Sequence, residues 1–67
     1  MKQLFLEIYA KVFNEDGTIK ACGRTVCIQL ISLAKQLGTA DSYGDETNGF
    51  IDIEAMHSLY EKIKAEV

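Results

Sequence analysis

Residues 4 to 13 constrain the fold most, because this stretch is apolar at every even position. Its odd positions carry aromatic and charged side chains, namely Phe5, Glu7, Tyr9, Lys11 and Phe13. A β-strand with this pattern has apolar surface on both faces. The remainder of a 67-residue chain is large enough to cover only one of them. We therefore expect the second face, which bears the three rings, to contact a partner; the alternative is that the rings fill the core and the even positions face outward.

The same stretch also fits a helix, because its polar residues recur every three or four positions. The next segment of the chain favours a strand. Residues 14–17, Asn-Glu-Asp-Gly, are typical of a turn, and residues 18–21 resume apolar alternation. Pairing Phe13 with Thr18 keeps the apolar residues of both strands on one face. We predict a β-hairpin here, with a helix over residues 3–13 as the alternative.

Two helices are predicted downstream. Residues 24–37 combine a broad apolar arc with a polar stripe, and Gly38 suits the left-handed position that often closes a helix. Asp52 suits the N-cap of a last helix. Residues 39–49 are polar and aperiodic, which indicates a long loop. The predicted fold is α+β, a single domain over residues 1–67 with an N-terminal β-hairpin packed against two α-helices; the alternative is an all-α three-helix domain.

Charge and hydropathy exclude several classes of function. The net charge is −3 and no segment concentrates Lys or Arg, so we expect no contact with nucleic acid. No stretch approaches the roughly 20 apolar residues that span a bilayer, and no export signal is recognisable, so we expect a cytoplasmic protein without membrane contact. In that compartment Cys22 and Cys27 are expected to be reduced thiols.

The sequence is poor in reactive side chains. Cys22, Cys27 and His57 fall short of the four ligands that a structural zinc site needs. The sequence offers no Ser–His–Asp grouping, no glycine-rich phosphate loop and no pair of buried carboxylates. We expect no enzymatic activity, no metal and no cofactor.

Residues 44–55 resemble part of an EF-hand calcium loop. Gly49 and Ile51 match the invariant glycine and the aliphatic residue that follows it. The resemblance ends at both termini, where Gly44 replaces the first carboxylate ligand and Ala55 the closing glutamate. The alternative function is therefore a degenerate EF-hand-like helical module that binds a peptide helix without calcium.

A small acidic domain without catalytic groups fits a non-enzymatic protein-binding module, an inhibitor or adaptor of the kind often carried by phages and mobile elements. A lone two-stranded ribbon is marginally stable, which favours a homodimer. The predicted contact surface joins the aromatic row, its flanking charges and the loop over residues 39–49. Its residues are Phe5, Glu7, Tyr9, Lys11, Phe13, Tyr43 and Asp45.

Overall fold

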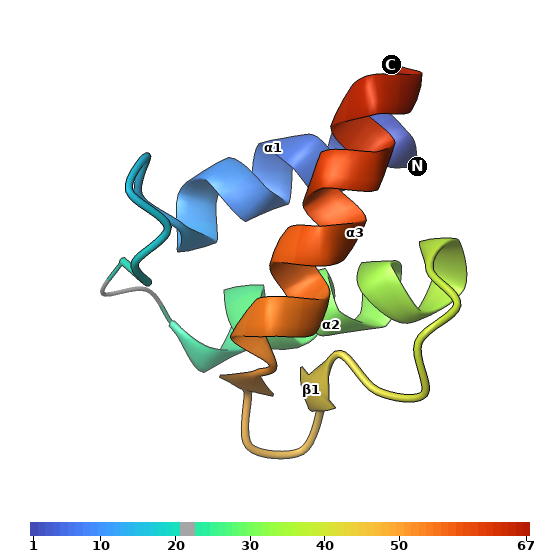
Figure 1. Ribbon diagram of the computed structural model, residues 1–67. Helices are drawn as coiled ribbons and strands as arrows, with labels where there is room; N and C mark the ends of the chain where they lie inside the picture. The colour runs from blue at the N-terminus through green and yellow to red at the C-terminus, as the bar shows by residue number, and fades with distance from the viewer. Residues whose placement is uncertain (21–22) are drawn as a thin grey trace.

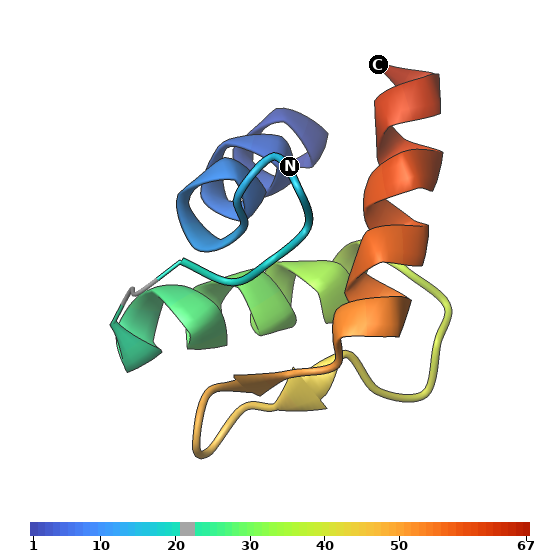
Figure 2. The same cartoon turned by 60° about the vertical axis from the view of Figure 1, so that its left-hand side comes forward.

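The computed structural model describes residues 1–20 and 23–67, which form three helices and a short antiparallel hairpin. The elements are α1 (Lys2–Val12), α2 (Arg24–Leu37), β1 (Gly44–Asp45), β2 (Phe50–Ile51) and α3 (Ile53–Glu66). Helix α3 stands upright beside α1 and α2, and the hairpin lies on the far side of α2 from α1 (Figure 1; Figure 2). The predicted α+β class is confirmed, although its strand part is short.

The predicted N-terminal strand was wrong, because residues 2–12 form α1. The period of 3.6 residues brings the apolar side chains Phe5, Ile8, Tyr9 and Val12 to one face of this helix, and all four are buried. A strand would have spread them over two faces and left one of them uncovered. The helical alternative covers them within the chain and needs no partner to do so.

The predicted turn at residues 14–17 is present directly after α1. The backbone N–H of Gly17 donates to the Asn14 carbonyl oxygen at 3.0 Å, and that of Asn14 donates to the Thr18 carbonyl oxygen at 2.7 Å. Gly17 has a φ of +89°, a conformation that favours glycine. The turn chemistry of this segment therefore does not depend on whether a helix or a strand precedes it.

One isolated antiparallel bridge joins the two sides of this turn. It joins Phe13 to Ile19, one position away from the predicted pairing of Phe13 with Thr18. Ala21 and Cys22 lie outside the described residues, so the pairing predicted for Ala21 and the free thiol predicted for Cys22 stay predictions.

Both predicted downstream helices are confirmed. α2 spans the predicted residues, and α3 begins directly after Asp52, whose Oδ1 accepts the backbone N–H of Ala55 at 3.1 Å as an N-cap. The left-handed conformation predicted for Gly38 was wrong, because its φ is −101° and its ψ 177°. A Cβ atom on Gly38 would overlap the Tyr43 hydroxyl, so close packing is what requires glycine there.

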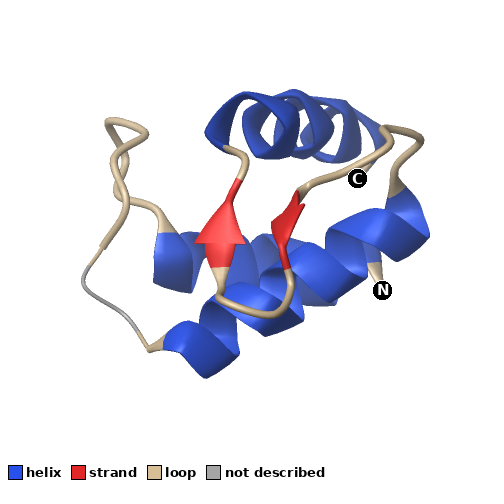
Figure 3. Cartoon of the chain, turned by 90° about the horizontal axis from the view of Figure 1, so that it is seen from below, coloured by secondary structure: helices blue, strands red, loops and turns tan. Residues whose placement is uncertain are grey.

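The segment predicted as a loop, residues 39–49, contains part of the hairpin (Figure 3). Gly44 pairs with Ile51, and Asp45 pairs with Phe50. Gly44 has a φ of +141°, and a Cβ there would collide with the Phe50 carbonyl oxygen. The close approach of the two backbones thus explains a glycine at the start of the hairpin.

One hydrophobic core joins all three helices to the segment before the hairpin. Its buried side chains are Phe5, Ile8, Tyr9, Val12, Phe13, Cys27, Leu30, Ile31, Ala34, Tyr43, Met56, Leu59 and Ile63. Among the residues that the structure describes, no helix has the length and apolar character needed to cross a membrane.

Candidate functional site

The residues of the predicted contact surface do not form one surface. Its four aromatic residues are buried, with exposed fractions of 0% for Phe5, 9% for Tyr9, 3% for Phe13 and 4% for Tyr43. The expectation of an exposed aromatic row was wrong, because α1 turns this face toward α2 and α3. A spacing of four groups the rings on one side in a helix as in a strand, but it does not say which side faces solvent.

The three charged residues of the predicted surface are exposed and lie on two different elements. Glu7 and Lys11 are on α1, and Asp45 is on β1. Their contact with a partner stays a prediction.

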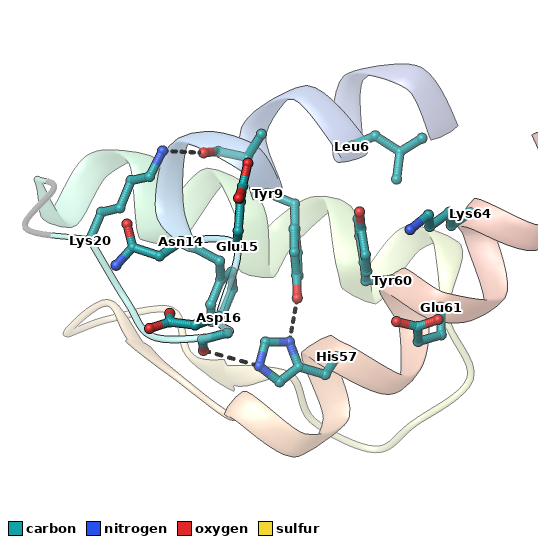
Figure 4. Close-up of a pocket in the computed structure, with 13 residues that line it drawn as sticks. Leu6, Tyr9, Asn14, Glu15, Asp16, Lys20, His57, Tyr60, Glu61 and Lys64 are labelled. Carbon is teal, nitrogen blue, oxygen red and sulfur yellow. Dashed lines mark hydrogen bonds between the residues drawn. The ribbon is translucent and has the colours of Figure 1, made fainter.

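A hollow of about 940 Å³ opens between α1, the turn that follows it and α3 (Figure 4). Its inner wall is built from stacked rings, because Tyr9 lies 4.5 Å from Phe13 and 3.9 Å from Tyr60 between ring centroids. The Nζ atom of Lys64 lies 5.7 Å from the Tyr60 centroid, within reach of a cation–π interaction. Besides Lys64 and His57, the polar side chains that line the hollow are Asn14, Glu15, Asp16, Lys20 and Glu61.

His57 lies at the base of this hollow and uses both ring nitrogens. Nδ1 is hydrogen-bonded to the Tyr9 hydroxyl, and Nε2 lies 3.2 Å from the Gly17 carbonyl oxygen (Figure 4). A carbonyl oxygen only accepts, so in the neutral ring we assign the proton to Nε2, and Nδ1 then accepts from the tyrosine O–H. His57 thereby joins α3 to α1 and to the turn at residues 14–17.

The protonation of Tyr9 agrees with this assignment. Burial, together with the nearby Tyr60 and Glu61, raises the pKa of Tyr9 to about 12. The hydroxyl therefore keeps its proton at neutral pH and remains a donor. A pair in which the tyrosine stays protonated and the histidine has no ring nitrogen free for a substrate suits a structural link better than acid–base catalysis.

The described part of the chain contains no group of three or more His, Cys, Asp or Glu side chains able to hold a metal ion. In the segment that resembles an EF-hand loop, the Asp45 carboxylate accepts hydrogen bonds from inside the loop. Its donors are the backbone N–H of Thr47 at 2.9 Å and, from Asn48, the backbone N–H at 3.3 Å and Nδ2 at 2.7 Å. These hydrogen bonds lower the pKa of Asp45 below its ordinary value.

The hairpin presents an aromatic side chain to solvent. Phe50 has 72% of its surface exposed, the largest fraction among the large hydrophobic residues described. Its neighbour Ile51 faces inward and packs against the core, as alternation along a strand requires. We call the outward side of residues 44–51 the hairpin surface. Sequence reasoning missed Phe50, although the Asn48-Gly49 pair directly before it is a strong hairpin signal.

Acidic side chains are frequent in and beside the hairpin. Asp41, Asp45, Asp52 and Glu54 are exposed, and none of them forms an ion pair within the described residues. Glu46 differs, because its carboxylate lies 3.4 Å from the Lys35 ammonium. Arg24, at the start of α2, adds one positive charge here, because a Cβ atom on Gly49 would lie 2.6 Å from its Cγ. The region beside the exposed ring of Phe50 therefore carries more carboxylates than cations.

Comparison of this chain with models of known protein families, with characterised proteins and with solved structures finds no significant match.

Proposed function

We propose that the chain is a non-enzymatic protein-binding module, an inhibitor or adaptor, that contacts its partner through the hairpin surface. The observation that carries this proposal is the exposure of Phe50 on a strand whose other side is packed on the core. Aromatic side chains supply much of the binding energy at protein interfaces, because they bury a large area with few rotatable bonds.

The backbone that carries Phe50 is held before any partner arrives. Tyr43, just ahead of β1, is buried, and its carbonyl oxygen accepts the backbone N–H of Asp52 at 3.0 Å. Asp45 closes the turn at the other end of the hairpin with three hydrogen bonds. A surface ordered in advance loses little conformational entropy on binding, which favours its use as a contact.

The charges indicate what kind of partner would fit. An excess of carboxylates beside one exposed ring matches an apolar pocket with a basic rim, since complementary charge speeds encounter and excludes other partners. Binding of this kind weakens as salt rises, because surface charges are screened. The hollow beside His57 lacks such a bias, because Lys20 and Lys64 oppose Glu15, Asp16 and Glu61 around it.

The test uses a matched pair of variants, Phe50→Ser and Ile19→Ser. Both remove an exposed large hydrophobic side chain, but Ile19 lies after the turn at residues 14–17 and not on the hairpin. Each variant is immobilised beside the wild type, and proteins captured from cells that express the chain are quantified. The proposal expects at least one protein that is captured by the wild type and Ile19→Ser and lost with Phe50→Ser.

Direct contact is then measured on the purified pair. Amide chemical shifts of the labelled chain should change most over residues 44–51 when the captured protein is added. The apparent affinity should fall on addition of salt. Capture that depends equally on Phe50 and Ile19, or shift changes centred on another element, would contradict the proposal.

A further inference from the structure

A second candidate surface consists of residues outside the hairpin. It is a groove of about 530 Å³ between α1 and α2, which we call the α1–α2 groove. Its apolar walls come from Leu4 and Ile8 on α1 and from Ile28 and Leu33 on α2. Leu4 is 47% exposed, so a substantial apolar area at the edge of this groove faces water. The α1 side of the molecule lies away from the hairpin (Figure 1; Figure 2).

Two opposite charges accompany this groove. Lys11 lines it, and Glu7 lies one helical turn earlier on the stripe of α1 that also carries Leu4 and Ile8. Glu7 and Lys11 are both exposed, and neither takes part in an ion pair within the described chain. Both charges are therefore available to a second molecule.

We propose that the α1–α2 groove binds a second copy of this chain, with the two α1 helices antiparallel about a twofold axis near Ile8. A twofold interface repeats every contact, so Glu7 of each copy comes within reach of Lys11 of the other. The exposed Leu4 of each copy then lies over apolar side chains of its neighbour. A single stripe with one negative and one positive residue complements itself only in this antiparallel arrangement.

The stripe favours a second copy over a foreign helix, because the same chain supplies both the negative and the positive residue of the ion pairs.

The size of the contact sets the strength of the dimer. A standard interface buries about 800 Å² on each partner, close to a fifth of the 4320 Å² that this chain exposes. A helix of 11 residues is only about 16 Å long, so a seam between two copies of α1 is smaller than that standard. The dimer is accordingly weak, with a dissociation constant on the order of 10 to 100 µM.

The test is the mass of the purified chain in solution, measured by sedimentation over a dilution series from about 1 µM to about 1 mM, a range that brackets this constant. Wild type is compared with Glu7→Lys, with Lys11→Glu and with the double variant that exchanges the two charges. Each single change places like charges opposite each other twice, so it weakens the dimer about tenfold or more at low salt. The double variant restores attraction and recovers the wild-type constant to within about threefold.

Glu54→Lys on α3 is the matched control, because it changes the net charge by the same amount as Glu7→Lys at a site away from the groove. It leaves the dimer intact if the effect depends on position and not on net charge. Far-ultraviolet circular dichroism at a fixed concentration checks that every variant retains its helices. The experiment needs no other protein, and Phe50→Ser leaves the dimer unchanged, so this proposal and the proposed function can fail separately.

Three results would overturn the dimer. The first is a wild type that stays monomeric over the whole concentration range. The second is a double charge exchange that does not rescue the single variants. The third is a monomer that binds an unrelated amphipathic helical peptide in the α1–α2 groove, which would assign the groove to the peptide-binding alternative.

Discussion

Replacing Gly38 by alanine tests why the end of α2 needs a glycine. The φ of −101° and ψ of 177° are open to any residue, so the backbone itself accepts alanine. Alanine also restricts the conformations of the unfolded chain more than glycine does, which by itself would stabilise the fold by about 0.4–1 kcal/mol. The added Cβ, however, would overlap the Tyr43 hydroxyl and lie 2.5 Å from Cζ of the same ring.

The cost of this overlap depends on the surroundings of Tyr43. Its ring is 4% exposed, and its hydroxyl oxygen accepts the backbone N–H of Ala40 at 3.2 Å, so it cannot turn aside without disturbing the core. Overpacking of this kind costs about 1–3 kcal/mol. After the gain from the unfolded chain, we expect Gly38→Ala to lower the free energy of unfolding by about 1–2 kcal/mol. For a domain of this size that lowers the melting temperature by about 5–15 °C.

The assay is urea and thermal unfolding, followed by circular dichroism, for the wild type, Gly38→Ala, Tyr43→Phe and the double variant. Tyr43→Phe removes the hydroxyl that overlaps the added Cβ most, so Gly38→Ala should cost at least about 0.5 kcal/mol less in the Tyr43→Phe background. Gly23→Ala is the control, because a Cβ at Gly23 meets nothing within 4 Å, and its effect should stay within about 0.5 kcal/mol.

Two results would refute the reasoning. If Gly38→Ala is as stable as the wild type, the hydroxyl of Tyr43 does not occupy the space beside Gly38. If alanine costs the same with and without the Tyr43 hydroxyl, the penalty lies in the backbone, as the sequence alone had suggested.

Three further predictions concern hydrogen bonds of the described residues. Tyr9→Phe removes the donor to His57 Nδ1 and should lower the free energy of unfolding by about 1 kcal/mol at neutral pH. Because the pKa of Tyr9 is about 12 in the folded chain and ordinarily 10.0, the stability of the wild type should fall as pH rises from 10 toward 12, and this fall should be smaller in Tyr9→Phe. Because the pKa of Asp45 is lowered in the folded chain, its ionised carboxylate stabilises the fold above the ordinary pKa of 3.8, and this stabilisation is lost as pH falls through the folded pKa. In urea titrations the difference in stability between wild type and Asp45→Asn should therefore narrow from about pH 6 to about pH 3, and a constant difference would contradict this. Asp52→Ala removes the N-cap bond to the Ala55 N–H and should cost about 1 kcal/mol in thermal unfolding, whereas Asp52→Asn should retain most of the stability.

Local signals in the sequence were sufficient for α2, α3 and the turn at residues 14–17. Both helices show a 3.6-residue apolar period, and Asp52 provides a cap whose hydrogen bond spans only three residues. The turn contains Gly17, which takes a positive φ that other residues rarely adopt. These features depend on interactions between residues near one another in the chain, so no knowledge of the core was needed to predict them.

The candidate site was less accessible from the sequence. The link between Tyr9 and His57 joins residues 48 positions apart, and nothing local to either one predicts it. Phe50 was overlooked because the segment around it lacks the alternation of a longer strand. Its exposure depends on Ile51 being the neighbour that packs against the core.

The sequence by itself determined two helices, one turn and the presence of an apolar N-terminal stretch with three rings on one side. Only the tertiary structure decided that this stretch is helical and that Phe5, Tyr9 and Phe13 face inward. Period-2 and period-3.6 patterns both fit a run so rich in apolar residues, so local preference was nearly balanced. Helices α2 and α3 decide between them, because they bury the face of α1 that carries Phe5, Ile8, Tyr9 and Val12.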